Sequence, residues 1–219
     1  LKEYLPKINS TNNKGINSIM KKLSINNIDI TSEDIGYKIA PLINAVGRIG
    51  DPKIIIDLLT NDSTKSIDKL TNECFAMNRE RKKITSLYEE EALEIAQNQY
   101  NNNRKFLVLV NREWHPGIIG IVAARMVDKF NLPTAIIAEA NDGKFRGSIR
   151  SNNKLKVNLA LDECSDLLVA HGGHSAAAGF SIKEENIDKL KVKLNNIAIR
   201  EFKNIDLNKS LKPEAHINF

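Results

Sequence analysis

The stretch from Thr71 to Tyr100 limits the possible folds of this chain most strongly. It contains neither glycine nor proline. Apolar residues recur in and beside it near helical spacing, among charged ones: Leu70, Cys74, Met77, Ile84, Leu87, Ala92 and Ile95. This periodicity predicts one long amphipathic helix. Consecutive asparagines at 101–103 then interrupt the pattern, so the helix is expected to end there.

Beyond the asparagines, short apolar runs alternate with amphipathic segments. The apolar runs predict strands at 106–110, from Pro133 through Ile137, at 145–149 and at 176–182. The amphipathic segments predict helices at 117–129, 157–169 and 184–202, with a loop forced by Gly172-Gly173. The predicted fold class is α/β: a helical region with a long helix, followed by a mixed β-sheet domain flanked by helices.

Composition places the chain among folded globular proteins. Its 219 residues are 42% hydrophobic and 27% charged, which excludes small disulfide scaffolds and disordered chains. The net charge of +5 permits an anionic partner such as nucleic acid, although a solvated lysine-rich surface explains it equally well. Cys74 and Cys164 form no CxxC pair, so we expect buried thiols rather than a disulfide or a zinc site.

The ends of the chain and its hydropathy give two further expectations. No apolar run approaches the ~18 residues that a membrane span needs, so we expect a soluble, cytoplasmic protein. The sequence starts without Met and stops mid-pattern at residues 217–219, so we expect a piece of a longer protein.

The segment Arg146-Gly147-Ser148-Ile149-Arg150-Ser151 carries groups that suit phosphate at the end of a predicted strand. A guanidinium binds phosphate in bidentate fashion, and the hydroxyls add donors. A solvated strand end is an equally good interpretation.

The glycine-rich segment His171-Gly172-Gly173-His174-Ser175 is a second candidate. Paired glycines let backbone N–H groups approach a ligand closely, although they also occur in ordinary turns. Two histidines three apart could bind a metal, but no carboxylate or Cys with ligand spacing accompanies them. Phosphate contact is therefore favoured over metal binding.

Other polar positions have structural explanations beside functional ones. His115, between a predicted strand and helix, could meet an anion, or Trp114-His115-Pro116-Gly117 could be a helix-start turn with a packed Trp. Asn44 and Arg48 would share a helix face, although the small residues between them also suit helix packing. Asn78 and Arg81 are most simply solvent-facing.

Taken in this order, these segments resemble the RecJ family of single-strand-specific DNA exonucleases, within the DHH phosphoesterase superfamily. Each short motif is weak alone, and the ordered set is specific. The resemblance rests on Ile43–Arg48 as the linking motif, Asn78–Lys82 in the long helix, Glu113–Gly117 through Arg125 as the first strand-to-helix crossing, and Gly147-Ser148, Arg150-Ser151, Gly172-Gly173-His174 and Ala177-Ala178-Gly179 as the substrate-binding DHHA1 domain.

The resemblance implies a division of the chain into a helical linking region at 1–70, a connecting helix at 71–102, a DHHA1-type domain at 103–206 and a tail at 207–219. The family's DHH lobe, which holds a divalent metal (Mg or Mn), would precede this segment, and an OB-type domain would follow it. No DHH triplet occurs here, so we expect no metal bound by this segment and no activity from it alone.

The resemblance also implies functional roles, in a 5′-to-3′ exonuclease that acts on single-stranded DNA in repair and recombination. His174 would contact the scissile phosphate, where neutralising developing charge is useful. Ser148 and Arg150 would receive a 5′ phosphate, with Gly172 and Gly173 beside them. Asn44, Arg48 and His115 would line the cleft, the first two near the phosphate.

Two positions depart from the family pattern, and two rival functions stay open. Leu42 stands where an Arg is usual, and Ile149 where a small residue is common; Ile149 permits close backbone approach only if it points into the core. The rivals are a DHH-family nucleotidase or cyclic-dinucleotide phosphodiesterase, and a non-catalytic nucleic-acid-binding module. An aromatic content of 5% argues against a broad base-stacking platform.

Overall fold

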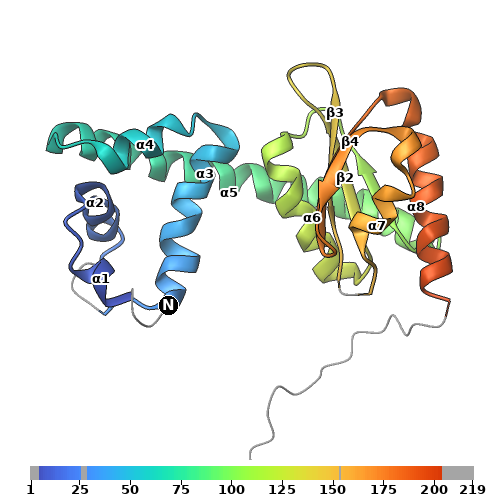
Figure 1. The fold of residues 1–219 in the computed structure, drawn as a ribbon, viewed down its shortest axis with the longest axis horizontal. Helices are drawn as coiled ribbons and strands as arrows, with labels where there is room; N and C mark the ends of the chain where they lie inside the picture. Colours follow the sequence, from blue (N-terminus) through green and yellow to red (C-terminus); the bar gives the residue numbers. More distant parts are fainter. Residues whose placement is uncertain (1–4, 26–28, 153, 204–219) are drawn as a thin grey trace, which may run out of the picture. The chain divides into compact units, whose positions relative to one another are not determined.

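A computed structural model describes residues 5–25, 29–152 and 154–203. The chain divides into two compact units, Leu1–Ser86 (unit 1) and Leu87–Phe219 (unit 2). The blue-to-teal part of the ribbon in Figure 1 is unit 1, and unit 2 carries the colours from green to red. Among the described residues, no helix is long and apolar enough to cross a membrane.

The described part of unit 1 is helical, as the sequence predicts. Its elements are α1 (Leu5–Asn9), α2 (Lys14–Lys22), the π-helical turn η1 (Asp34–Ile39), α3 (Ala40–Ile49), α4 (Lys53–Thr60) and the first part of α5 (Thr64–Asn101). Apolar side chains from all but the first of these form one buried cluster, which includes Ile19, Ile39, Leu42, Leu58 and Cys74. Cys74 is a buried free thiol within this cluster, as the sequence predicts. Burial raises the pKa of this thiol to about 11.

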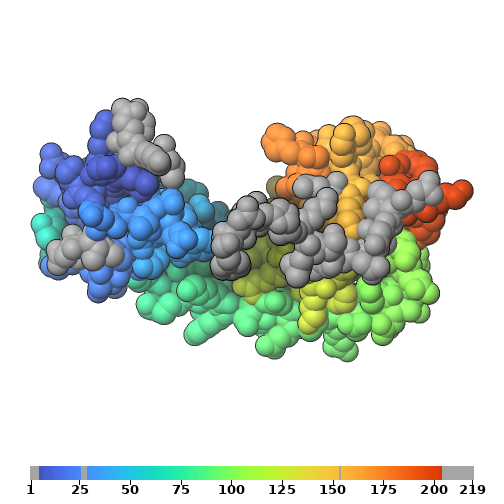
Figure 2. All heavy atoms as spheres, turned by 90° about the horizontal axis from the view of Figure 1, so that it is seen from below, coloured from blue at the N-terminus to red at the C-terminus, as the bar shows by residue number. Residues whose placement is uncertain are grey.

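Helix α5 confirms the long helix and begins earlier than predicted, at Thr64 rather than Thr71. Its additional turns are fixed by Ile67, which is 3% exposed and continues the apolar spacing toward Cys74. After Asn101 the backbone reaches a left-handed conformation at Asn103 (φ 57°), which ends the helix. In Figure 2, which draws all heavy atoms, the blue-green run of spheres belongs to α5.

A capping arrangement fixes the start of η1. The Asp34 carboxylate accepts hydrogen bonds from Thr31 N (3.0 Å) and Thr31 Oγ1 (2.8 Å), and the Asp34 N–H donates to Thr31 Oγ1 (3.2 Å). Lys38 Nζ lies 2.7 Å from the same carboxylate. The hydrogen bond from Lys38, followed by those from Thr31, lowers the pKa of Asp34 to about 2. The side chain is therefore a buried, paired anion at neutral pH.

Unit 2 is built on one five-stranded mixed sheet with the order β1-β2-β3-β5-β4. The strands are β1 (Leu107–Val110), β2 (Thr134–Glu139), β3 (Phe145–Arg150), β4 (Leu168–Gly173) and β5 (Ala177–Ile182). β1 and β2 are parallel, connected by α6 (Pro116–Phe130), and the remaining pairs are antiparallel. In Figure 1, α6 lies on one face of the sheet, whereas α7 (Val157–Asp162) and α8 (Ile187–Glu201) lie on the other.

One predicted element is wrong. The helix expected over 157–169 ends at Asp162, a 3₁₀ turn follows at Ser165–Leu167, and residues 168–173 form strand β4. The glycines at 172 and 173 therefore lie in a strand and not in a loop. Pairing with β5 provides partners for the backbone N–H and C=O groups that face β5, and that pairing outweighs the helical pattern of the segment.

The outer edge of β1 is closed by a side chain of α5. Gln99 Oε1 accepts from Val108 N (2.9 Å), and Gln99 Nε2 donates to Val108 O (2.8 Å). One amide thus makes both bonds that a neighbouring strand would make at this residue. An open strand edge invites pairing with other chains, and this contact blocks it at Val108.

Replacing Gln99 by Ala is expected to lower the free energy of unfolding. It leaves the N–H and C=O of the buried Val108 without their partner, a loss of roughly 1–3 kcal/mol for such groups. Urea denaturation measures the change. Gln97→Ala is the matched control, because the exposed Gln97 donates to the Asn101 side chain of its own helix. Equal losses in the two variants would contradict the edge-closing role.

Asp34→Asn is expected to destabilise unit 1 at neutral pH, with a difference that disappears in acid. Because the folded-state pKa is depressed to about 2, the ionised carboxylate stabilises the fold above its unfolded pKa of ~4. That contribution is lost as pH falls from ~4 toward 2. Denaturant titrations of the parent and the variant between pH 7 and pH 2 test this. Asp68→Asn, at an exposed position of α5, controls for removal of one charge.

Candidate functional site

Strand β3 presents an alternating set of side chains to the two faces of the sheet. Phe145, Gly147 and Ile149 are buried, whereas Arg146, Ser148 and Arg150 are exposed or half-buried. Ile149 is 0% exposed, so the residue that departs from the family pattern points into the core and does not obstruct the other face. Arg146, Ser148 and Arg150 therefore share the face on which α6 lies.

Two glycines flatten this face beside Ser148. Ser148 pairs with Gly179 of β5, and Gly179 pairs with Gly172 of β4, so the three lie in one row across the sheet. A Cβ atom at Gly172 would meet nothing within 4 Å, and one at Gly179 would come no closer than 3.6 Å to Gly147 O. Neither packing nor a left-handed backbone requires glycine at these positions. Their effect is to leave the sheet surface low enough for a ligand to touch the backbone.

Two other glycines are required by the fold. A Cβ at Gly147 would lie 2.0 Å from the Phe180 ring, which covers this residue in the core. Gly173 has a φ of 147°, and its Cβ would lie 2.5 Å from Ala177 O. The two glycines predicted to bind a ligand together therefore differ. Gly173 is required by its backbone conformation, whereas Gly172 leaves the sheet surface without a side chain.

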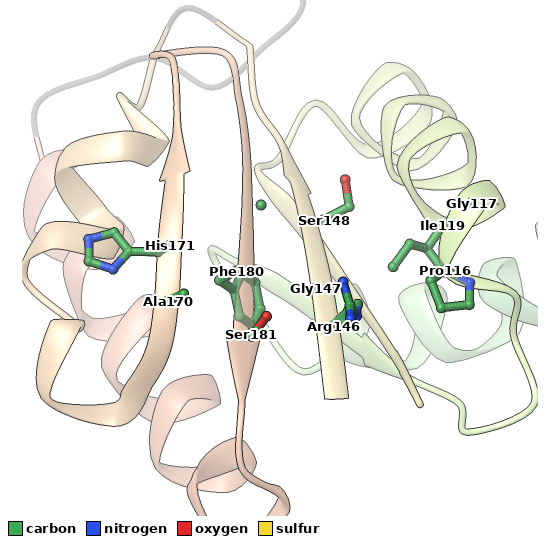
Figure 3. A pocket seen from close by; sticks show the side chains of 11 residues that line it. Pro116, Gly117, Ile119, Arg146, Gly147, Ser148, Ala170, His171, Phe180 and Ser181 are labelled. Carbon is green, nitrogen blue, oxygen red and sulfur yellow. The ribbon is translucent and has the colours of Figure 1, made fainter. Parts of the chain in front are cut away.

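A hollow of about 570 Å³ lies between the start of α6 and this open face. Its lining comes from Pro116, Gly117 and Ile119 of α6 and from strands β3, β5 and β4, with the small residues Ser148, Gly179, Ser181 and Ala170 among them. In Figure 3, Ser148 points toward α6, and the His171 ring lies beyond β4, away from Ser148. His171 Nε2 there lies 3.0 Å from Asp162 Oδ1.

Arg150 lies against α6 at the end of β3. Its Nη1 donates to Ser148 Oγ (3.0 Å) and to Ile149 O (2.8 Å). Gly120 of α6 makes room for both side chains, because a Cβ there would be 2.9 Å from Arg150 Nη2 and 3.0 Å from Ser148 Oγ. The structure therefore brings Ser148 and Arg150 into one hydrogen-bonded pair.

His174 lies in the exposed turn that joins β4 to β5. Its N–H donates to Ala177 O (2.8 Å), and its carbonyl accepts from Ala177 N (3.3 Å). Ala177 in turn pairs with Arg150. With ~4.8 Å between neighbouring strands, the backbones of Arg150 and His174 are ~10 Å apart. Thus Ser148, Arg150, Gly172, Gly173 and His174 lie toward one end of the sheet, and of these five Ser148 lines the hollow of about 570 Å³. That they form one shared site stays a prediction.

His115 is the N-cap residue of α6, where its Nδ1 accepts from Gly117 N (3.0 Å). Trp114 beside it is 1% exposed and donates from Nε1 to Glu91 Oε2 (2.6 Å), so the packed-Trp interpretation is confirmed. The Tyr88 hydroxyl accepts from His115 N (3.1 Å) and donates to Glu113 O (3.2 Å). This network holds the turn, while His115 lines a second hollow of about 340 Å³.

Arg146 opens the segment that the sequence analysis marked as suited to phosphate, although no separate role was predicted for it. It is exposed and lines both hollows, and its Nη2 lies 3.2 Å from Asp142 Oδ2. The backbone hydrogen bond from Lys144, and then that from Arg146, hold the pKa of Asp142 below its usual value. The sequence spacing could have predicted this position. Residues i, i+2 and i+4 of a strand lie on the same face, so Arg146 shares a face with Ser148 and Arg150.

Asn44 and Arg48 belong to unit 1, so their placement is described within that unit alone. Both are exposed on one face of α3, together with Gly47, whose Cβ would meet nothing within 4 Å. Gly47 therefore does not pack against another element, whereas Ala45 is 0% exposed and lies in the packed interior. Leu42, which replaces the usual Arg, is buried.

The simplest interpretation of Asn78 and Arg81 is wrong. Asn78 is 9% exposed, and its Oδ1 accepts a hydrogen bond from Arg81 Nη2 (2.7 Å). Arg81 is half-buried and not solvent-facing. Amphipathic spacing alone misses this because asparagine is polar and its burial depends on what packs over it.

The described residues do not supply a metal site. Within 5–25, 29–152 and 154–203, no group of three or more His, Cys, Asp or Glu side chains is placed to hold an ion. Cys164 is a buried free thiol whose burial raises its pKa to about 11, so it is protonated at neutral pH. The open face offers hydrogen-bond donors, cationic side chains and exposed backbone, a set that suits an anionic, extended ligand.

Comparison with known proteins defines the class of this fold. Residues 103–200 match the DHHA1 domain family. A solved structure of RecJ in complex with Mn²⁺ from Thermus thermophilus superimposes with a TM-score of 0.81 at 28% identity, over 91% of this chain and 29% of that one. Its Mg²⁺ complex gives 0.80 at 27% identity, over 91% and 30%. Residues 103–200, which lie within unit 2, are accordingly a DHHA1 domain.

Curated relatives identify the family more narrowly. The single-stranded-DNA-specific exonuclease RecJ of Bacillus subtilis is 32% identical over 195 residues, which are 89% of this chain and 25% of the relative. That of Escherichia coli is 31% identical over 185 residues, 81% and 32% respectively. The chain belongs to the RecJ family, and it spans about a quarter to a third of the length of these relatives.

Gly120→Ala is expected to disturb the Ser148–Arg150 pair without unfolding the domain. The new methyl group meets the far end of a flexible guanidinium, which moves easily, and Ala is favoured over Gly in a helix by ~1 kcal/mol. We expect an unchanged or higher Tm and a shifted NMR resonance of the Arg150 Nε–H. Gly47→Ala, which adds a methyl group in open space on α3, controls for helix propensity. A lower Tm together with an unmoved Arg150 resonance would contradict this geometry.

Proposed function

We propose that this chain is the strand-binding part of a RecJ-like exonuclease that degrades single-stranded DNA in the 5′-to-3′ direction, in DNA repair and recombination. The observation that carries the proposal is the flat row Ser148–Gly179–Gly172, flanked by Arg146 and Arg150. A backbone that is exposed for no structural reason, beside two guanidinium groups, suits close contact with a sugar-phosphate chain.

In this proposal each predicted residue has a role set by its position. Ser148 and Arg150 receive the 5′ phosphate, since their hydroxyl and guanidinium are already oriented by one hydrogen bond. His174, at the exposed turn, contacts the scissile phosphate, and the backbone at Gly172 and Gly173 lies beside it. His115 lines the path of the strand. Asn44 and Arg48 contact its backbone from unit 1.

Hydrolysis in this proposal requires parts of the whole protein beyond the described residues. The relatives from Thermus thermophilus were solved with Mn²⁺ and Mg²⁺, whereas the described residues offer no cluster for either ion. We therefore assign the metal, Mg or Mn, to a DHH lobe, and place an OB-type domain beyond the tail. The chain by itself is expected to bind single strands without cleaving them, in the cytoplasm.

Arg150→Ala is expected to weaken binding of 5′-phosphorylated single strands more than that of 5′-hydroxyl strands. A charge-assisted hydrogen bond to phosphate contributes roughly 1.5–3 kcal/mol, so the phosphorylated strand should lose about tenfold or more in affinity. The salt dependence of its affinity should also fall. Fluorescence anisotropy with both oligonucleotides at several salt concentrations measures these changes.

Lys189→Ala is the matched control for that experiment, because it removes one exposed positive charge from α8, which lies on the other face of the sheet. It should weaken both oligonucleotides slightly and equally. If Arg150→Ala behaves in the same way, Arg150 is only a surface charge and the 5′-phosphate role is wrong.

A further inference from the structure

Two side chains of α5, one helical turn apart, hold the turn that carries His115. The Tyr88 hydroxyl accepts from His115 N (3.1 Å) and donates to Glu113 O (3.2 Å), so it bridges two backbone groups of this turn. Glu91 Oε2 accepts from Trp114 Nε1 (2.6 Å) between them. The long helix therefore fixes the position of the turn.

The two contacts differ in what they contribute to the fold. The Trp114 indole is 1% exposed, and Glu91 supplies the partner that its N–H needs. The Tyr88 hydroxyl meets the chain at an exposed turn, where water can replace it as the partner of both backbone groups. Such an exchange changes the stability of a fold little. It does remove the constraint on the distance and direction between the two groups.

The side chain of His115 is oriented as a hydrogen-bond donor. Its Nδ1 accepts from Gly117 N (3.0 Å), so the neutral ring carries its proton on Nε2. The side chain is exposed and lines the hollow of about 340 Å³. The direction of this donor depends on the backbone of His115, which the Tyr88 hydroxyl holds.

The smaller hollow places this donor beside the larger one. Arg146 lines both hollows, and Pro116, the residue after His115, does the same. Figure 3 shows Pro116 and Arg146 on the two sides of the larger hollow. A strand that follows the sheet surface to this end meets Arg146 and His115 in the same region. His115 extends the donor set of the larger hollow only if its ring keeps its direction.

We propose that Tyr88 is a positioning residue of the candidate site and acts through His115. The inference rests on the proposed function and adds to it a residue outside the surface that meets the ligand. Tyr88 does not touch the strand, and its hydroxyl keeps the His115 donor in the direction that the strand meets. Without the hydroxyl, the turn has to be ordered on binding, and that cost appears as weaker affinity.

Tyr88→Phe removes the hydroxyl and keeps the ring against Trp114, 5.8 Å away between centroids. The chain as given should then bind a single-stranded oligothymidylate about threefold to tenfold more weakly in fluorescence anisotropy, with an almost unchanged Tm. Tyr100→Phe is the matched control on the same helix. The Tyr100 ring packs likewise on Phe130 (5.4 Å), and its hydroxyl makes no hydrogen bond among the described residues. This control should bind like the parent.

A double-mutant cycle tests whether Tyr88 acts through His115. His115→Ala should weaken binding, and adding Tyr88→Phe to it should weaken binding little further, because the ring to be positioned is gone. Nitrogen NMR of the His115 ring gives a readout that a loss of stability would not move. Its two ring signals should shift in Tyr88→Phe and stay in place in Tyr100→Phe.

The outcomes separate this inference from the proposed function. If the parent binds the oligonucleotide and either Tyr88→Phe or His115→Ala binds equally well, the positioning role is wrong while the strand-binding function stands. If Tyr88→Phe weakens binding by the same factor with and without His115, or leaves the His115 ring signals unmoved, the hydroxyl serves the fold and the role is again wrong. If the parent binds no single strand, the proposed function fails and the inference fails with it.

Discussion

The pairing of β3 with β5 is the interaction that creates the candidate site. Six residue pairs join the two strands, and β4 then adds to the far side of β5. This ladder places Ser148 in a row with Gly179 and Gly172, and Arg150 in a row with Ala177 and the backbone of His174. The pairing is compatible with a packed core because the Phe180 ring fits where Gly147 has no side chain.

The two faces of this sheet have different roles: one forms the apolar core, and the other is partly exposed to solvent. On one face, Phe145, Ile149 and Phe180 are buried, and this apolar layer fixes the strands. On the other face, α6 covers the sheet only in part, and the exposed surface beyond it is flat. The start of α6 is held by Trp114, whose indole bonds Glu91, and by the Tyr88 hydroxyl at His115. A rigid helix start therefore lies beside a flat strand surface, which suits an extended anionic ligand.

In unit 1, as in the sheet, buried residues fix an element whose exposed face carries polar side chains. A buried apolar cluster and the capping of η1 by Asp34 fix the helical segment, and the exposed face of α3 carries the amide of Asn44 and the guanidinium of Arg48. In both units, rigidity comes from residues outside the surface proposed to bind the ligand. Because the backbone is already ordered before binding, the ordering cost that remains is mainly that of the exposed side chains.

Features that depend on local periodicity were predictable from the sequence, whereas the meeting of distant segments was not. The long helix, the α/β alternation and the shared face of Asn44 and Arg48 follow from spacings of 3.6 or 2 residues, and the ordered motifs indicated the family. Residues 168–173, by contrast, became a strand because β5 offered hydrogen bonds, although the local pattern favoured a helix. Asn78 is buried and Tyr37 is exposed, against the usual preference of each residue type. Strand pairing and burial are fixed by partners distant along the chain, and a local pattern carries no record of them.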